Sequence, residues 1–537
     1  MEQEIAILFF LLKNALARAF RPQCLSVYLF FLLSACAPVG PDFLKSELAS
    51  QNQWLESSEQ GLEPVPADVS LWWQVFNDPV LNELVESARA NNNNLEIAGL
   101  RVLESRAQLG IAIGTLYPQS QRINGNATHL SPPDSSGPTS NYWQYGLNFS
   151  LGWEVDFWGR FRRGIEASDA AFMGSLAAYD QALLLLTAQV VDTYTVIRAT
   201  EEQLRISREN ITLQKRSYDI TEVLYRNGQD SGLDMQQANS LLLSTQSTIP
   251  TLESALKQAR NALSVLLGQA PGSVNALLAR AKDPNIIPLI PTDIAVGFPA
   301  DMLRRRPDVR QAELQAMAQN ALVGLAEADL YPSFSLIGSI GLTAGGPIDD
   351  DFDNLFDSDA ITYSIGPSFS WPFLSYGRIR NNIRVQDARL QQALINYRET
   401  VLQAAREAED AMAAFNGSTQ QSVLLKKTVA SSKRSNELAM LRFREGFSDY
   451  QRVLDSQQAL FSQQQRYVTS QSDKVRNLIA LYKALGGGWE DRRGLPMISP
   501  QTKETMEQRT NWGELLDGAY SPSDNADKQG GIPRPDW

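Results

Sequence analysis

Strict alternation of apolar and small polar side chains marks the stretch from Trp143 to Trp153. Every second position is apolar: Trp143, Tyr145, Leu147, Phe149, Leu151 and Trp153. The positions between them hold only Gln, Gly, Asn and Ser. A period of two predicts a β-strand with one apolar face and one small, polar face.

The second half of the chain repeats this pattern. Apolar residues of one parity are Ile361, Tyr363, Ile365, Phe369, Trp371 and Phe373, interrupted by Pro367. Partner strands are expected after Pro332, where Phe334, Leu336, Ile340 and Leu342 share a parity, and at roughly 120–130, where the pattern is weakest. The sequence therefore predicts two strand pairs, at about 119–153 and about 333–374.

Most of the remaining chain has the pattern of long helices. There is no proline between Arg160 and Arg226, or between Phe373 and Leu495. A helix of about 65 residues is about 100 Å long, which exceeds the diameter of a globular domain. Frequent small residues favour close packing between such helices, as in coiled coils.

An internal repeat organises these elements. WEVDFWGR (153–160) matches WPFLSYGR (371–378) and YRNG (225–228) matches FREG (443–446), both shifted by 218 positions, whereas the helices before the strands match with a shift of 214. Each copy reads helix, strand, strand, very long helix, helix. The predicted divisions are a signal peptide (1–35), an anchored N-terminal segment (36–78), a first repeat (79–300, with its long helix pair at about 160–268), a second repeat (301–490, with its long helix pair at about 378–486) and a polar C-terminal tail (491–537).

The N-terminus reads as an export signal. Basic residues precede a short apolar run from Cys24 to Leu33, and Leu33-Ser34-Ala35-Cys36 follows directly. This pattern resembles the bacterial lipobox, in which the cysteine, here Cys36, is acylated and becomes the first residue. The alternative is an ordinary signal peptide cut near Ala35 or Ala37. Since Ala37 is not an aspartate, a lipoprotein of this kind is expected at the outer membrane, with the covalent lipid on Cys36 and no other cofactor.

Composition narrows the function further. The chain has 537 residues and a net charge of −12. Because it is acidic and has no basic stripe, we do not expect it to bind nucleic acid. It has two cysteines, both before residue 40, and one histidine, His129. A disulfide or cysteine-based metal site later in the chain is therefore impossible. A multi-His metal site cannot be built from one chain, and a His-based triad is not expected. No acid–base or nucleophile constellation is visible, so we do not expect an enzyme.

The length of the strands and their two faces suggest a membrane barrel. Strands of about 11–13 residues can cross a bilayer at a tilt, with the apolar face toward lipid and the polar face toward water. Aromatic residues at the ends of the strands, such as Trp153, Trp158, Trp371 and Tyr376, are typical of an interfacial girdle. Four strands cannot close a barrel, and open edges are not tolerated in lipid. Several chains must therefore contribute: two would give eight strands and three would give twelve. The alternative is a periplasmic protein whose strands pack on its own helices.

Several motifs together resemble the outer-membrane efflux protein (TolC-like) family, in particular its lipoprotein branch. They are LSAC-APVGPDF (33–43), WWQVFNDPVLNELVESA (72–88), LLGQAPG (266–272), LRRRPDVRQAE (303–313), LYPSFSL (330–336) and ALYKALGGGW (480–489). The resemblance covers about residues 36–490. It implies a homotrimer in which a 12-stranded barrel, embedded in outer-membrane lipid, continues into a long helical tunnel. It also implies a passive exit duct that binds a periplasmic adaptor (membrane fusion) protein and a resistance-nodulation-division (RND) transporter of the inner membrane.

The resemblance also assigns candidate residues at the end of the helices far from the strands. An Arg-x-Gly-x-x-Ser turn in the family contacts the adaptor, and Arg226, Gly228 and Ser231 match it. In the second repeat Arg444 and Gly446 match, but Asp449 replaces the serine. Inward aspartate rings close the tunnels of relatives, and Asp234 and Asp455 occupy corresponding positions. Arg452 lies where some relatives have an acid, and it is expected to pair with Asp455 or Asp234. Plain helix caps and a solvated helix face are the simpler interpretations.

Efflux of drugs, detergents or other toxic amphiphiles is therefore the leading function. A conduit for secreted proteins or peptides uses the same fold and stays open as an alternative. So does a periplasmic coiled-coil lipoprotein without a pore.

Overall fold

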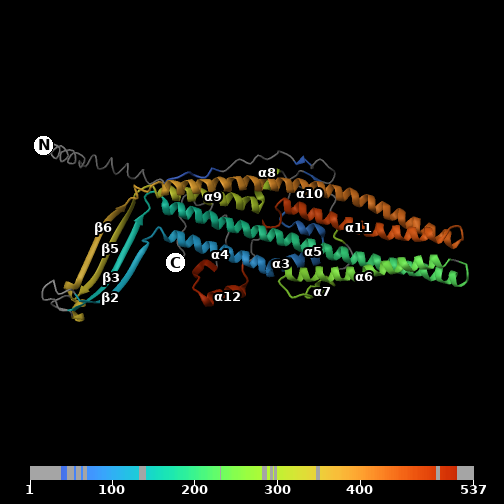
Figure 1. Cartoon of the computed structure of the whole chain (residues 1–537), viewed down its shortest axis with the longest axis horizontal. Coiled ribbons are helices and arrows are strands. Elements are labelled where there is room, and N and C mark those ends of the chain that lie inside the picture. The colour runs from blue at the N-terminus through green and yellow to red at the C-terminus, as the bar shows by residue number, and fades with distance from the viewer. Residues whose placement is uncertain are drawn as a thin grey trace.

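The computed structural model describes most of the chain between residues 38 and 516. The described residues are 38–44, 54–55, 62–63, 69–131, 141–229, 231–280, 287–290, 294–295, 299–345, 351–490 and 496–516. The predicted signal peptide and Cys36 lie outside them. The molecule is elongated, with a β-sheet at one end and the tips of two helical hairpins at the other (Figure 1).

Each repeat contains one very long helix accompanied by two shorter ones. In the first repeat α4 (Asn93–Gly114) and α6 (Gly232–Leu266) pack along α5 (Arg160–Arg226). In the second, α9 (Pro307–Ala328) and α11 (Tyr450–Ala484) pack along α10 (Arg378–Arg444). Both long helices have 67 residues, which corresponds to about 100 Å. The long helices and the repeat are thus as predicted, and α6 continues through Pro250.

Four strands form one antiparallel sheet in the order β2-β3-β5-β6. The strands are β2 (Ser120–Leu130), β3 (Tyr142–Val155), β5 (Ser333–Ala344) and β6 (Ile361–Ser370). The predicted end of the last strand is wrong, because β6 has only 10 residues and Trp371 and Phe373 follow it. The weak first strand is present at the expected place.

Equivalent positions in the first strand of each pair, β2 and β5, differ by 213 in residue number. In the helices that precede these strands, α4 and α9, they differ by 214. Ser333 follows Pro332 directly, whereas Gln119 separates Pro118 from Ser120. The Gln119 side chain accepts from the Glu154 N–H at 2.7 Å and donates to the Glu154 carbonyl at 3.0 Å. The extra residue therefore pairs with β3 through its side chain and restores the register.

Shorter elements form a belt around the middle of the helices. They are β1 (Leu62–Glu63), which pairs with β4 (Ile294–Ala295), the 3-10 helix η2 (Trp72–Phe76), α3 (Pro79–Asn91), α7 (Asn275–Leu278) and α8 (Pro299–Arg305). Asp78 caps α3 by accepting from the N–H groups of Val80 and Leu81. The indole of Trp72 is buried and stacks on Tyr482 with ring centroids 5.3 Å apart. Apolar packing therefore fixes the belt to α11.

The predicted polar tail contains folded structure. Residues 496–516 include α12 (Pro500–Arg509) and the 3-10 helix η7 (Gly513–Leu516). Ile498 and Met506 pack against Leu103 of α4, and the Cβ of any side chain at Gly99 would lie 2.2 Å from the Met497 carbonyl oxygen. The description of 491–537 as a plain tail is therefore wrong for this part. Ser499 followed by Pro500 is a helix-start signal that the sequence did carry.

Candidate channel wall, junction and tunnel tips

The two faces of the sheet differ sharply in chemistry. Phe149 of β3 lies opposite Ile123 of β2 on one side and Ile340 of β5 on the other. Ile340 in turn lies opposite Tyr363 of β6. On the reverse face Ser150 lies between Arg122 and Ser339, and the hydroxyls of Ser339 and Ser364 are 2.8 Å apart. The alternation predicted in single strands thus continues across all four as an apolar face and a polar face.

The apolar face is exposed in the single chain. Side chains with more than half of their surface exposed are Ile123, Ile340, Ile361, Tyr363, Ile365 and Phe369. None of the described α-helices packs on this face (Figure 1). Only the short 3-10 helix η4 (Phe352–Phe356) touches its end far from the helices, where Phe352 contacts Tyr145. The alternative prediction, that the strands pack on the chain's own helices, is therefore wrong. An exposed apolar surface of this extent requires an apolar environment.

Strands β2 and β6 leave both edges of the sheet unpaired within the described chain. Unpaired backbone N–H and C=O groups are costly in a hydrocarbon environment. The edges therefore need strand partners from outside this chain if the apolar face is in lipid.

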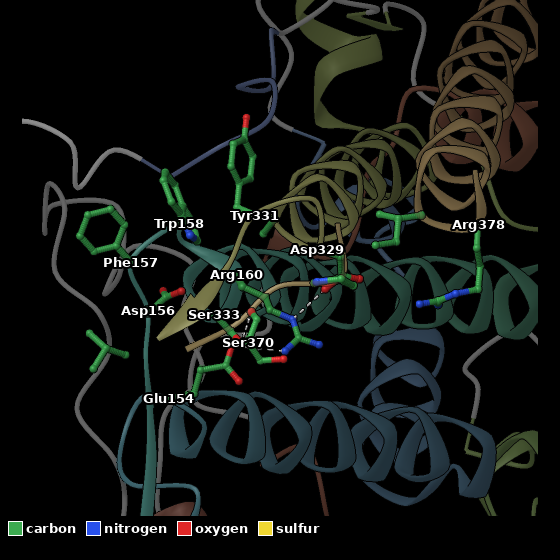
Figure 2. A pocket seen from close by; sticks show the side chains of 14 residues that line it. Glu154, Asp156, Phe157, Trp158, Arg160, Asp329, Tyr331, Ser333, Ser370 and Arg378 are labelled. Atoms are coloured by element: carbon green, nitrogen blue, oxygen red, sulfur yellow. Dashed lines mark hydrogen bonds and ion pairs between the residues drawn. The ribbon is translucent and has the colours of Figure 1, made fainter. Parts of the chain in front are cut away.

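A polar hollow of about 260 Å³ lies where the sheet meets the helices (Figure 2). Arg160, at the start of α5, lies between Asp329 at 3.2 Å and Glu154 at 3.6 Å. Asp156, Ser333, Ser370 and Arg378 also contribute to the polar lining. Because Glu154, Ser333 and Ser370 belong to the polar face, the charged hollow continues that face toward the helices.

Aromatic side chains gather at the same level. The Trp158 indole stacks on Tyr331 at 4.6 Å and donates to the Pro332 carbonyl at 2.8 Å. Trp371, Phe373 and Tyr376 follow β6 and are more than half exposed. Trp158, Trp371 and Tyr376, which were predicted as part of a girdle, thus lie at the junction of sheet and helices, as an interfacial position requires.

The distant helix turns have the geometry that the glycines predict. Gly228 and Gly446 have φ angles of +68° and +76°. In each turn the following N–H bonds back across the helix end, from Gln229 to Leu224 and from Phe447 to Arg442. Glycine is favoured there because other residues are strained at positive φ.

The remaining predicted contact residues lie on the surface of these tips. Arg226 is exposed and forms an ion pair with Glu222 at 2.8 Å. Ser231 caps α6, with its hydroxyl accepting from Leu233 and Asp234 N–H groups. Asp449 starts α11 at the equivalent position but makes no side-chain cap. Arg444 is exposed and lines a hollow between the two tips, which Asp234 and Tyr450 also line.

The predicted aperture residues lie on the first turn of α6 and the first two turns of α11. Asp234 is half-buried, whereas Arg452 and Asp455 are exposed. The expected pairing of Arg452 with Asp455 or Asp234 is one across the constriction, between copies of the chain, so it stays a prediction. Within one chain the Asp455 carboxylate accepts from Gln451 at 2.8 Å, because residues four apart lie directly above one another on a helix.

Two of the four buried arginines among the described residues hold distant segments together, and the sequence prediction missed both. Arg306, before α9, donates to the Ala484 carbonyl at 2.9 Å and to Asp308 and Glu407 at 2.7 Å. Arg163 of α5 donates to the carbonyls of Val39 and Gly40. Only the runs of arginine in LRRRPDV and GRFRRG hinted at them. Among the described residues, no group of three acidic, histidine or cysteine side chains could hold a metal ion.

Comparison with known proteins decides the family. The model described as outer membrane efflux protein matches residues 84–269 and 298–487, which is more than half of the chain. The chain belongs to the outer membrane efflux protein family. The predicted family, the mostly helical fold with a membrane sheet, the outer-membrane location and the role in efflux are thereby confirmed.

Individual relatives agree with this assignment. The chain is 29% identical over 481 residues to the solvent efflux pump outer membrane protein SrpC of Pseudomonas putida, covering 87% of this chain and 98% of that protein. It is 28% identical over 472 residues to the probable outer membrane lipoprotein SilC of Salmonella typhimurium, covering 88% and 99%. The solved outer-membrane channel OprN superposes with a TM-score of 0.78 at 31% identity, covering 84% of this chain and 99% of that chain. This efflux protein therefore shares the fold of a channel.

One stretch of α5 is long and apolar enough to span a membrane by length and composition, but 67% of it is buried within the chain. Burial of this kind is typical of a core helix in the tunnel wall.

Proposed function

We propose that three copies of this efflux protein close a 12-stranded barrel in the outer membrane and continue it as a helical tunnel across the periplasm. The exposed apolar face of the sheet, bounded by two unpaired edges, is the observation that carries the proposal. Twelve strands lie in the range of membrane barrels, and four do not.

The two long helices support the same assembly. Helix α5 has 30 buried residues, whereas its repeat counterpart α10 has 12, although both have 67 residues. Helix α5 is flanked by α4 and α9, whereas α10 is flanked by α9 alone, so one of the two flanking positions beside α10 is vacant in the described chain. In a ring of repeats, α4 of the neighbouring copy takes the vacant place beside α10.

The repeat also predicts how β6 of one copy pairs with β2 of the next. Positions in β6 correspond to β3 with a shift of 218, and positions in β5 correspond to β2 with a shift of 213, as the ladders show. The contact between β3 and β5 places Ser150 opposite Ser339. The equivalent contact, between β6 of one copy and β2 of the next, places Ser368 opposite Asn126 of the neighbouring copy, on the water-filled side of the barrel.

Cysteine cross-linking tests this arrangement. The variant carrying Ser368→Cys and Asn126→Cys should form a covalent trimer on oxidation in membranes, since directly opposite Cβ atoms lie about 4.5–5.5 Å apart. The control carrying Ser368→Cys and Thr128→Cys, shifted by two residues, should cross-link weakly. Equal cross-linking of both pairs, or a covalent dimer as the largest product, would contradict the closed trimer.

The hairpin tips form the proposed docking surface for the periplasmic adaptor. Arg226, Ser231 and Arg444 are exposed there, and Gly228 and Gly446 leave open space around the turns. Through the adaptor the tunnel receives substrate from an RND transporter of the inner membrane, which supplies the energy. The proposed substrates are toxic amphiphilic compounds. Deletion of the gene should raise sensitivity to such compounds, and complementation of a strain lacking its own duct should restore resistance.

The first turn of α6 and the first two turns of α11 form the proposed periplasmic aperture. Asp234, Asp455 and Arg452 project from these turns, and in a narrow ring their charges act at short range. If Arg452 bridges acidic groups of neighbouring copies, Arg452→Ala loosens the aperture and single-channel conductance rises. An unchanged conductance would remove Arg452 from the aperture.

Acylation of Cys36 is the last element of the proposal. Mass spectrometry of the mature N-terminus should show a lipid-modified cysteine, and Cys36→Ser should abolish that mass increment.

A further inference from the structure

The segment Pro38–Leu44, directly after the proposed lipid attachment point, is bound in a groove between α5 and α9. The Val39 N–H donates to the Trp158 carbonyl at 3.0 Å. The Asn320 side chain of α9 donates to the Pro41 carbonyl at 2.8 Å. Both sides of the groove thus hold the segment through its backbone.

Arg163 is the central residue of this groove. Its guanidinium donates to the carbonyls of Val39 and Gly40, both at 3.1 Å, and to the Asp42 carboxylate at 2.9 Å. The side chain is only 4% exposed, and Glu166 also accepts from it at 2.8 Å. A buried guanidinium is unfavourable unless its donors are paired. The N-terminal segment supplies most of those partners, so the groove is incomplete without it.

Two glycines allow the close approach. A Cβ at Gly159 would lie 2.4 Å from the Pro38 Cβ, and a Cβ at Gly324 would lie 2.9 Å from the Val39 carbonyl oxygen. Gly159, Arg163, Asn320 and Gly324 together form what we call the anchor seat.

The anchor seat lies at the level of the aromatic girdle. Trp158, whose carbonyl binds Val39, precedes Gly159, and its indole stacks on Tyr331 (Figure 2). Cys36 is joined to Pro38 through a single residue, and two residues of extended chain span at most about 7 Å. An acyl group on Cys36 would therefore be tethered by a very short link to a segment that is bound at the boundary between sheet and helices.

We propose that the anchor seat fixes the point at which the acyl chains on Cys36 enter the bilayer, beside the aromatic girdle between the two repeats. This inference rests on the proposed acylation of Cys36. Without the seat, the segment is a flexible tether, and the acyl chains can reach the membrane anywhere around the subunit. With it, each subunit carries its lipid at one defined position of the wall.

The internal repeat shows that this position is specific. In the corresponding groove, which α10 forms with α4 of a neighbouring copy, the equivalent glycines are Gly377 and Gly110. The polar residues differ, however, because Asn381 replaces Arg163 and Arg106 replaces Asn320. Asn381 is too short to reach three acceptors, and it lacks the fork of donors that a guanidinium has. The segment is therefore bound at one of the two junctions and not at its counterpart.

Spin labelling of the full-length trimer in lipid bilayers tests the proposal. Leu44 is 85% exposed, so a nitroxide on Leu44→Cys reports the segment without filling the groove. The label should be immobilised, and its collision rates with oxygen and a nickel chelate should place it at the membrane interface. Arg163→Met should increase its mobility several-fold and abolish the defined depth, and Arg163→Lys should have an intermediate effect because it keeps the charge but not the fork.

The matched control is Arg162→Met. Arg162 is the neighbouring residue, but its guanidinium pairs with Asp156 at 3.1 Å. This variant should leave the label immobile, and gel analysis should show a trimer for every variant. A label that is equally mobile, or equally immobile, in the parent and in Arg163→Met would overturn the proposal that the anchor seat holds this segment.

An immobile label in a protein whose Cys36 carries no lipid by mass spectrometry would overturn the anchoring role alone. The cross-linking result would then still decide the proposed conduit, so the two failures are distinguishable.

Discussion

A single charge placed on either face of β5 tests which face meets lipid. Ile340 lies near the middle of the strand on the apolar face, is 55% exposed and is flanked by Phe149 and Tyr363. Ser339 is the adjacent residue at nearly the same depth, on the polar face. Ile340→Arg and Ser339→Arg therefore introduce the same side chain and differ in the direction in which it points.

The expected magnitudes differ clearly. An arginine on the lipid face at the bilayer midplane costs about 2–4 kcal/mol. Since about 1.4 kcal/mol corresponds to a factor of ten, the folding equilibrium of each subunit falls by about 30- to 900-fold. Three copies bring the cost to about 6–12 kcal/mol per trimer. Ser339→Arg removes the 2.8 Å contact with the Ser364 hydroxyl, which amounts to about 0.5–1.5 kcal/mol.

Urea unfolding of the protein in lipid vesicles, followed by tryptophan fluorescence, measures both effects. The fraction of trimer on seminative gels gives a second readout. We expect Ile340→Arg to lower the unfolding midpoint and the yield of trimer, and Ser339→Arg to stay close to the parent. The assignment of the faces is wrong if the two variants are equally stable or if Ser339→Arg is the more damaging one.

Three further predictions concern the helices. Arg306→Met leaves the Ala484 carbonyl and Glu407 without their buried donor. Because the Asp308 and Glu407 carboxylates are 28% and 44% exposed and can be hydrated, thermal unfolding by circular dichroism should show a loss of about 1.5–3 kcal/mol; unchanged unfolding would mean that the buried network is dispensable. The Thr502 side chain lowers the pKa of Glu96 by hydrogen bonding. The stabilising effect of the Glu96 carboxylate is therefore present above its unfolded-state pKa and lost as pH falls through its folded-state pKa. Protection factors for hydrogen exchange in residues 496–516, taken relative to the intrinsic rate at each pH, should fall on acidification in the parent but not in Glu96→Ala. Gly446→Ala introduces no clash but a strained positive φ, so it should destabilise the tip by about 1–2 kcal/mol in local hydrogen exchange while trimer formation is kept.

The buried seam between α5 and α11 differs from the apolar core of the belt. Gln457 donates to the Ser217 hydroxyl at 2.7 Å, and Asn210 donates to Gln464 at 2.8 Å. Toward the tips the two hairpins are thus joined partly by side-chain hydrogen bonds. Such bonds contribute less net stability than apolar burial of the same area.

Local periodicity specifies much of this protein. The alternation from Trp143 to Trp153 fixes both the strand and its faces, because side chains alternate across a strand. The proline-free stretches indicate the long helices, and Gly228 and Gly446 mark their ends. The shift of 218 positions establishes the repeat, since equivalent elements need equivalent local sequences. Each of these features depends on residues close together in the chain.

Contacts between distant segments depend instead on the packing of the complete fold. Three arginines lie close together at the start of α5, yet Arg160 binds Asp329, Arg162 binds Asp156 and Arg163 binds the N-terminal segment. The sequence cannot distinguish them, because one turn of helix carries all three and their partners lie up to 169 positions away. The same reason explains why the packing of α12 on α4 was missed. The spacing of apolar residues determines whether a segment forms a helix or a strand. The partner of a polar side chain is instead set by the packing of the whole chain.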